Sequence, residues 1–164
     1  MKKIKVQELS PEAFAPYGSY VNLLKPEGEV FGALPIAFYR DMLPAQMGVD
    51  VSISFSVCAV SPRERVVDII EYHSKTCEGN LPLDMDVLVH VGPATANGVL
   101  PDRIEVFRIP KGTLFVLRPG VWHHAPFATG DGVSNNLVVL PERTYANDCI
   151  VETLTGDARY LIEE

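Results

Sequence analysis

The stretch "GTLFVLRPGVWHHAPF", from Gly112 to Phe127, joins an apolar run to a proline–glycine turn and then to two adjacent histidines. Its first half, Gly112 to Gly120, is rich in the aromatic and β-branched residues that favour a strand. The chain contains only four histidines and one tryptophan, and two of those histidines follow the tryptophan here. Such a cluster either packs a turn with aromatic rings or directs a histidine into a pocket, and the rest of the sequence must distinguish the two.

Segments of the same kind recur on both sides of this stretch. They are separated by connections rich in Gly, Pro, Asn and Asp, such as "CEGNLPLD" and "ATGDGVSNN". Short strands at regular spacing, with no helical segments between them, predict a β-sandwich or barrel and not a parallel βαβ sheet. We expect strands within Val49–Val60, Arg65–His73, Asp86–Gly92, Arg103–Pro110, Gly112–Gly120 and Asn135–Glu142.

One helix is predicted, near the start, in "LSPEAFAPYG". Ser10 is a good N-cap and Pro11 suits the first helical position, because its missing N–H would have no partner there. Gly18 is a stop signal, and Pro16 limits the helix to a turn or two. The N-terminal helix is therefore short.

Length and composition narrow the class of protein. The 164 residues fit a single domain, 1–164, and 47% hydrophobic residues suffice for a sizeable core. With a net charge of −7, we expect neither nucleic acid nor a membrane as partner, because anionic surfaces require clustered Lys and Arg. No apolar run is long enough to span a bilayer.

The three cysteines show no C-x-x-C spacing, which is typical of a reducing compartment, and we expect a cytoplasmic protein. Cys58 and Cys149 stand in apolar surroundings, where a cysteine is usually a small buried hydrophobic residue; Cys77 is less certain.

Candidate chemistry lies in "IIEYHSKTCEGN", where Glu71, His73 and Glu78 form an E-x-H-x4-E pattern. If the strand runs through His73, the side chains of Glu71 and His73 point to the same face. Two polar groups on one face of an apolar strand are costly unless that face lines a cavity. Glu78 is placed in a turn-like segment, where a solvated loop glutamate is an alternative to a site residue.

These residues, with His123, give the chain its resemblance to the cupins, whose motifs look like G-x5-H-x-H-x3,4-E-x6-G and G-x5-P-x-G-x2-H-x3-N. His73 falls on the second histidine of the first motif, Glu78 on its glutamate and His123 on the histidine of the second motif. Glu71 stands where the first histidine would be. The resemblance implies an all-β, cupin-like jelly-roll β-barrel. In it Glu71, His73, Glu78 and His123 could bind a divalent metal, whose identity N and O ligands leave open.

A resemblance to the ureidoglycolate lyases covers nearly the whole chain. It is carried, in order, by "LSPEAFAPYGSYV", "EYHSKTCEGNLPL", "VWHHAPF" and "NDCIVE". That family has a cupin-type barrel, is usually dimeric, and cleaves ureidoglycolate to glyoxylate and urea in purine catabolism, within allantoin degradation. The resemblance implies a homodimeric carbon–nitrogen lyase with a small-molecule substrate.

The chemistry of that substrate assigns roles. One carbon of ureidoglycolate bears a hydroxyl, a carboxylate and a ureido nitrogen, so its cleavage requires a base and an acid. Glu71, His73 and His123 in an apolar barrel can supply both, or can be metal ligands. The substrate carboxylate also requires a cation, for which Arg118, Lys111 and a divalent ion are candidates.

Four residues of the quoted stretch are expected to contact substrate: Arg118, Trp122, His124 and Phe127. Each has an alternative. Trp122 and Phe127 suit core packing, His124 suits a dimer contact, and Arg118 suits a surface salt bridge.

Two other functions stay open. One is a cupin isomerase or epimerase for a sugar or sugar acid, with the same residues moving a proton next to a carbonyl. The other is a non-catalytic cupin that binds a small ligand. Outside the candidate site, His90 is interpreted as a strand histidine with a backbone partner, and Asp84 and Asp86 as residues that shape the turn after "NLPL".

Overall fold

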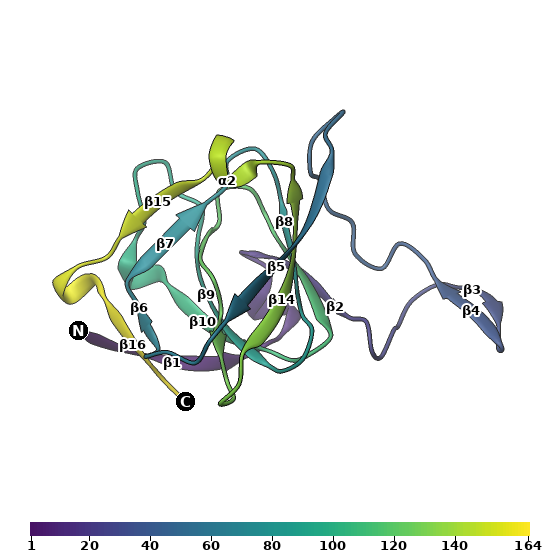
Figure 1. The fold of residues 1–164 in the computed structure, drawn as a ribbon, viewed down its shortest axis with the longest axis horizontal. Helices are drawn as coiled ribbons and strands as arrows, with labels where there is room; N and C mark the ends of the chain where they lie inside the picture. Colours follow the sequence, from purple (N-terminus) through teal and green to yellow (C-terminus); the bar gives the residue numbers. More distant parts are fainter.

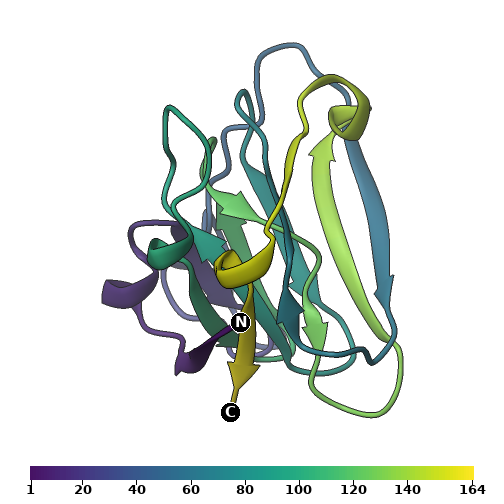
Figure 2. The ribbon, with the colours of Figure 1, turned by 90° about the vertical axis from the view of Figure 1, so that its left-hand side faces the viewer.

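The computed structural model describes residues 1–164, which form two facing β-sheets and a hairpin that projects from one side (Figures 1 and 2). The larger sheet contains nine strands: β1 (Lys2–Glu8), β6 (Val66–Val67), β7 (Ile69–Tyr72), β9 (Val87–Gly92), β10 (Glu105–Ile109), β12 (Trp122–His123), β13 (Phe127–Ala128), β15 (Ile150–Thr153) and β16 (Tyr160–Glu163). They follow the order β15-β7-β12-β9-β10-β1-β16-β6, with β13 paired to β9.

The smaller sheet contains β2 (Gly18–Asn22), β5 (Ile53–Val60), β8 (Glu78–Pro82), β11 (Thr113–Leu117) and β14 (Ser134–Pro141), in the order β2-β11-β8-β14-β5. The projecting hairpin is formed by β3 (Val30–Ala33) and β4 (Ile36–Tyr39). The helices are α1 (Pro11–Phe14) and α2 (Thr144–Asn147), with 3₁₀ turns at Pro101–Arg103 and Gly156–Ala158. None of these helices has the length and apolar composition that crossing a bilayer requires.

The all-β expectation is confirmed, and each of the six expected segments overlaps a strand. The connection "CEGNLPLD" needs a correction, because Glu78–Pro82 is strand β8. It pairs with β11 on one side and β14 on the other, so its backbone is satisfied by two neighbours. A central position in a sheet overrides the low strand propensity of Gly and Asn, and Pro82 stands at the strand end, where a missing N–H is tolerated.

The short N-terminal helix forms as its sequence predicts. The Ser10 hydroxyl accepts a hydrogen bond from the Ala13 N–H at 3.2 Å, and Pro11 occupies the first helical position. The helix directs Phe14 into the space between the sheets, where its ring is fully buried. The helix therefore contributes a single aromatic anchor, Phe14, to the core of the fold.

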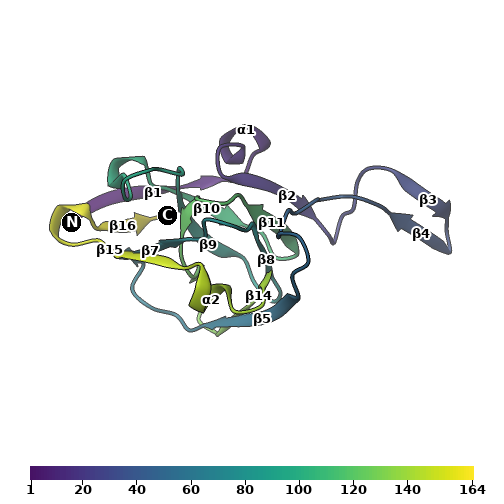
Figure 3. The same ribbon diagram turned by 90° about the horizontal axis from the view of Figure 1, so that it is seen from above.

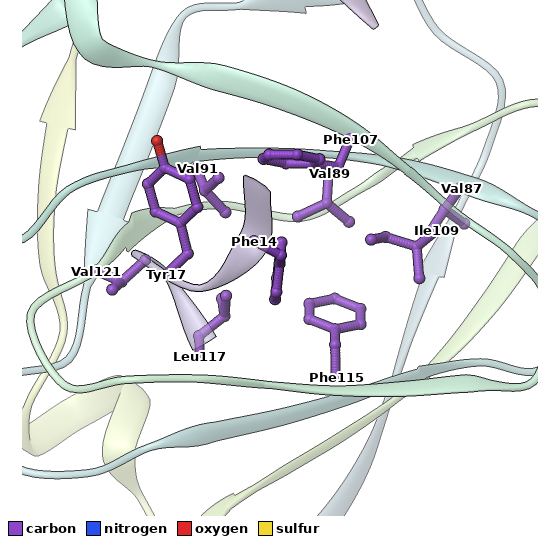
Figure 4. Close-up of a cluster of buried hydrophobic side chains, with 10 residues drawn as sticks. All are labelled: Phe14, Tyr17, Val87, Val89, Val91, Phe107, Ile109, Phe115, Leu117 and Val121. Carbon is purple, nitrogen blue, oxygen red and sulfur yellow. The ribbon is translucent and has the colours of Figure 1, made fainter. Parts of the chain in front are cut away.

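The first core cluster lies around that anchor (Figure 4). The Phe14 ring meets Phe107 at a centroid distance of 5.4 Å and Phe115 at 6.1 Å, both edge to face. Since β10 and β11 belong to different sheets, Phe14 ties the two sheets together. The cluster comprises Phe14, Tyr17, Val87, Val89, Val91, Phe107, Ile109, Phe115, Leu117 and Val121.

A second cluster covers the opposite face of the larger sheet. It comprises Val67, Ile70, Leu88, Ile104, Val106, Trp122, Phe127, Leu154, Tyr160 and Ile162. Strand β9 therefore has a core on both faces: Val89 belongs to the first cluster and Leu88 to the second. This explains why all six of its residues are buried.

His90 is on the same face of β9 as Leu88, away from the space between the sheets. Its Nε2 lies 3.3 Å from the Ile69 carbonyl oxygen, which confirms the expected backbone partner, but its Nδ1 has none. Burial, reinforced by the neighbouring His124, lowers the pKa of His90 to about 3. The imidazole is thus neutral in the folded protein over the physiological range.

We predict that Phe14→Ala lowers the free energy of unfolding by about 3–5 kcal/mol, because it opens a cavity between the sheets. Phe14→Leu, which retains more volume, should cost clearly less. Urea unfolding followed by circular dichroism measures both, with Leu100→Ala at an exposed position as the control. Equal losses for Phe14→Ala and Leu100→Ala would contradict the anchoring role of Phe14.

A second prediction concerns acid stability. The unfolded chain protonates His90 below about pH 6.5, whereas the folded protein does not until about pH 3. The unfolded state binds more protons in this window, so stability falls as the pH falls, by up to about 1.4 kcal/mol per pH unit from this one group. Denaturant titrations between pH 4.5 and 7 should show a shallower loss for His90→Phe than for the wild type. Parallel curves would refute this source of acid sensitivity.

Candidate active site

A cavity of about 160 Å³ lies between the two sheets. Cavities of roughly 150 Å³ can bind a ligand the size of benzene, so this volume suits a small substrate. Its apolar wall consists of Val89, Phe115, Leu117, Ala125, Pro126, Val138 and Leu140. Its polar lining consists of Cys58, Glu71, His73, Glu78, Asn80, His123, His124, Tyr145 and Cys149.

The larger sheet supplies Glu71, His73 and His123. Glu71 on β7 is paired in register with His123 on β12, which brings their side chains together on the cavity face. His73 follows the end of β7, two residues after Glu71, and also lines the cavity. The expectation that Glu71 and His73 share a face is confirmed.

The smaller sheet supplies Glu78, whose buried carboxylate lies between the two histidines. Its Oε2 is 2.8 Å from Nε2 of His73 and 3.1 Å from Nε2 of His123. Its Oε1 accepts a hydrogen bond from the Asn80 side-chain amide at 2.9 Å. The alternative of a solvated loop glutamate was wrong, because the strand character of β8 places this side chain in the interior.

Both imidazoles are oriented from behind by backbone carbonyls. Nδ1 of His73 donates to the Asp148 carbonyl at 2.6 Å, and Nδ1 of His123 donates to the Val121 carbonyl at 2.9 Å. The Asp148 carboxylate in turn accepts from the backbone N–H groups of Ser74 (2.9 Å) and Lys75 (2.8 Å). These contacts fix both rings with Nε2 directed at the cavity.

The carboxylate of Glu78 and the imidazoles of His73 and His123 stabilise one another's charged forms. Burial would raise the pKa of Glu78, but the charges and hydrogen bonds of His123 and His73 outweigh it and hold that pKa well below its usual range. Burial opposes a charge on each histidine, yet the Glu78 carboxylate raises the pKa of both. Glu78 is therefore the anion on which both imidazoles depend.

The donor set fits a metal ion. Ligand atoms of Glu71, His73 and His123 lie within 4.8 Å of one another, and Glu78 contacts both imidazoles. A histidine whose Nδ1–H is held by a carbonyl presents Nε2 as a ligand, which is the usual second-shell arrangement at metal sites. These residues can bind a divalent cation, or exchange protons with a substrate.

Two further groups of the cavity stand outside this network. The Cys149 thiol donates to Oε2 of Glu71 at 3.2 Å, and burial together with that bond raises its pKa to about 12, which excludes a thiolate nucleophile near neutral pH. Burial lowers the pKa of His124, so that this imidazole is neutral near pH 7. No Lys or Arg is among the lining residues.

Of the four residues expected to contact substrate, only His124 lines the cavity, and the structure places the other three outside it. Trp122 precedes His123 on a strand and therefore points to the opposite face. It packs on Tyr72 at 4.5 Å and donates to the Thr95 hydroxyl at 2.8 Å. Phe127 belongs to the same core cluster as Trp122. Arg118 is exposed on the far side, where it donates to the Pro16 carbonyl at 3.3 Å.

Asp84, Asp86 and Lys111 are all absent from the cavity lining. Asp84 accepts hydrogen bonds from Asn135, and Asp86 accepts one from the Lys111 N–H, so both shape turns as expected. Lys111 is exposed and absent from the lining.

The cysteine interpretation needs a correction, because Cys58 and Cys149 are half-buried and line the cavity, whereas Cys77, which was left uncertain, is buried. Asn80 was missed because "CEGNLPLD" looked like a loop, although its alternation with Glu78 was visible. Tyr145 carried no signal in the sequence.

Comparison with known proteins identifies the relatives of the chain. A family model described as "Ureidoglycolate lyase" matches residues 1–161. A curated ureidoglycolate lyase of Rhodobacter capsulatus is 25% identical over 125 residues, which cover 75% of this chain and 77% of the relative.

Among solved structures, a dTDP sugar isomerase from Desulfovibrio desulfuricans superposes with a TM-score of 0.51 at 18% identity, covering 87% of this chain and 89% of that one. Oxalate decarboxylase of Bacillus subtilis gives a TM-score of 0.45 at 17% identity, covering 65% of this chain and 25% of that one. Likeness at this identity concerns the fold alone, and the expected cupin-like jelly roll is confirmed. With a family model that extends over residues 1–161, this chain belongs to the ureidoglycolate lyase family.

Proposed function

We propose that this protein is a single-domain lyase that cleaves ureidoglycolate, or a closely related small hydroxy acid, to glyoxylate and urea. The observation that carries the proposal is the cluster of Glu71, His73, Glu78 and His123 in a cavity of about 160 Å³, in a chain that belongs to the ureidoglycolate lyase family. The reaction serves purine catabolism.

The reaction moves one proton and breaks one bond. The hydroxyl oxygen loses its proton and becomes the aldehyde oxygen of glyoxylate. The electron pair of the carbon–nitrogen bond leaves with the ureido nitrogen, which takes up a proton and departs as urea. The hydroxyl oxygen and the ureido nitrogen are attached to the same carbon, and the proton that the oxygen loses equals the proton that the nitrogen gains. One group in the cavity can therefore act first as the base and then as the acid.

We assign this transfer to Glu71 and His124, and the support is that both line the cavity outside the tight network around Glu78. The Glu71 carboxylate can take the hydroxyl proton and return it to the nitrogen. His124, neutral near pH 7 because burial lowers its pKa, offers one N–H donor and one acceptor nitrogen to the substrate. Without a bound ion, His73 and His123 are hydrogen-bonded to Glu78 through Nε2, and these contacts hold the reacting end of the site in place.

The substrate carboxylate requires a positive charge, and the lining has no Lys or Arg to provide it. We therefore include a divalent metal ion in the proposal, which Glu71, His73 and His123 would hold, with Glu78 as a further carboxylate beside both imidazoles. Such an ion, when bound, supplies a Lewis acid for the carboxylate and the hydroxyl. The backbone bonds to both Nδ1 atoms support this role, since they keep Nε2 directed at the cavity.

A homodimeric assembly and a cytoplasmic location belong to the same proposal. Three free cysteines support a reducing compartment. Large apolar side chains exposed on the projecting hairpin support an assembly of more than one copy.

We predict that Glu71→Gln lowers kcat for urea release by about 100-fold or more, with a much smaller change in KM, because the isosteric amide retains the shape but cannot carry the proton. Arg118→Ala is the matched control, since Arg118 lies outside the cavity, and its kcat should stay within about twofold of the wild type. Steady-state kinetics on ureidoglycolate measure both. Equal effects of the two substitutions would refute the assignment of this cavity.

Elemental analysis of the purified protein should find a divalent metal at close to one per chain, lost in His123→Ala and retained in Arg118→Ala. A chelator should suppress urea release by the wild type, and adding back the metal should restore it. Full activity in a metal-free preparation would remove the ion from the proposal and leave the acid–base assignment standing.

A further inference from the structure

The strand that carries the two adjacent histidines is interrupted directly after His123. Strand β12 lies between β7 and β9 in the larger sheet, across from β5 and β14 of the smaller sheet (Figure 3). Its His123 is opposite Val91 of β9. The chain resumes this pairing as β13, where Phe127 is opposite Leu88. Between the two pairs, three residues of the chain face only two residues of β9. One extra residue in one strand of an antiparallel pair is a β-bulge, and we call residues 124–126, "HAP", the bulge.

The bulge changes which side chains reach the cavity. In a regular strand the side chains alternate between two faces, so of the three bulge residues only Ala125 would share a face with His123. Instead, His124, Ala125 and Pro126 all line the cavity. The alternation is also shifted beyond the bulge, because Phe127 belongs to the core cluster on the face opposite to His123. Bulges re-aim side chains next to active sites, and this one brings His124 to the cavity.

His90, one of the two β9 residues opposite the bulge, completes the hydrogen bonding that the bulge interrupts. On the other side of β12, His123 is paired with Glu71. Two residues further along, an uninterrupted ladder would pair Ala125 with Ile69. The Ile69 carbonyl oxygen instead lies 3.3 Å from Nε2 of His90. Because a carbonyl only accepts, the neutral imidazole carries its proton on Nε2. The buried His90 side chain therefore takes the place of a backbone donor beside the bulge.

Arg63, in the connection between β5 and β6, binds the backbone of the bulge. Its Nη1 donates to the Pro126 carbonyl at 2.9 Å, and its Nη2 donates to the Ala125 carbonyl at 3.1 Å. The guanidinium also lies over the Phe127 ring, 4.1 Å from the ring centroid. A planar guanidinium presents its N–H groups in a rigid fork, which suits two successive carbonyls. Arg63 thus fixes the two peptide carbonyls that follow His124.

The direction of the His124 side chain depends on this backbone. His73 and His123 are each oriented by a backbone carbonyl that contacts Nδ1. The His124 imidazole has no hydrogen bond of this kind, and its ring lies beside that of His90, with the centroids 6.4 Å apart. The conformation of the bulge therefore determines where the two ring nitrogens of His124 point.

We propose that His90 and Arg63 are positioning residues that hold the bulge in the conformation that presents His124 to the substrate. This role rests on the proposed function, in which His124 hydrogen-bonds to the substrate. Neither His90 nor Arg63 lines the cavity, so each acts through His124 and does not touch the reacting atoms. His90 replaces the ladder bond that the bulge removes, and Arg63 holds the carbonyls that the bulge frees. Loss of either contact releases His124 from its position.

The first test follows the imidazoles themselves and uses no substrate. Labelling with ¹⁵N-histidine gives ring signals in NMR for each of the four histidines. We expect the His124 signals to shift in both Arg63→Ala and His90→Phe. They should stay unchanged in Arg65→Ala, the matched control, because the Arg65 guanidinium donates to two backbone carbonyls just beyond the bulge, at 128–129. Circular dichroism checks that every variant is folded.

The second test is a double-mutant cycle on kcat/KM for urea release. Arg63→Ala and His90→Phe should each lower kcat/KM by about tenfold, because a misplaced His124 loses a hydrogen bond to the substrate. In a His124→Ala background, neither substitution should lower kcat/KM by more than about a further twofold. His90→Gln should recover most of the activity, since its side-chain amide can donate to the Ile69 carbonyl. Arg65→Ala should stay within about twofold of the wild type.

Three results would overturn the positioning role. They are unchanged His124 signals in both variants, equal losses of kcat/KM with and without His124, and a loss in Arg65→Ala as large as that in Arg63→Ala. A merely structural contribution of His90 or Arg63 would lower kcat/KM equally in both backgrounds. If the wild type releases no urea from ureidoglycolate, the proposed function fails, and the His124 signals alone decide whether these two residues hold the bulge.

Discussion

The site depends on the two hydrogen bonds that join the buried carboxylate of Glu78 to a pair of imidazoles. Glu78 comes from the smaller sheet, and its two imidazole partners, His73 and His123, come from the larger one. A buried carboxylate without partners is strongly unfavourable, so the two sheets must keep the spacing that brings both rings within hydrogen-bond distance. The Phe14 anchor helps to set the distance between the sheets, and its core cluster shares Val89, Phe115 and Leu117 with the cavity wall. The spacing of the sheets and the geometry of the site are therefore two aspects of one constraint.

Strand alternation explains what the sequence could predict and where it failed. The two-residue spacing of Glu71 and His73 placed both on the cavity face, because strand geometry is local and periodic. The same rule separates Trp122 from His123, and an assignment of both to the pocket overlooked it. Glu78 could not be placed from composition, because the strand character of β8 arises from its two neighbours in the sheet. The β3–β4 hairpin was not predicted, because its two short apolar strands pair only with each other and belong to neither of the large sheets.

The charge of the cavity connects the site to its substrate. Its lining contains two carboxylates and three histidines but no Lys or Arg. An anionic substrate enters such a cavity only if the histidines or a bound cation offset the carboxylates. The histidines around Glu78 can meet this requirement, because Nε2 of His73 and Nε2 of His123 are both directed at the same Glu78 oxygen.

The central claim is that this cavity splits the carbon–nitrogen bond of ureidoglycolate by elimination. The most direct measurement is product analysis by ¹³C NMR on carbon-labelled ureidoglycolate with the purified enzyme, together with an ammonia assay. We predict glyoxylate and urea in equal amounts, with no ammonia. Ammonia in place of urea would show that the ureido group is hydrolysed, and an unchanged substrate would show that another molecule is the substrate; either result would contradict the claim.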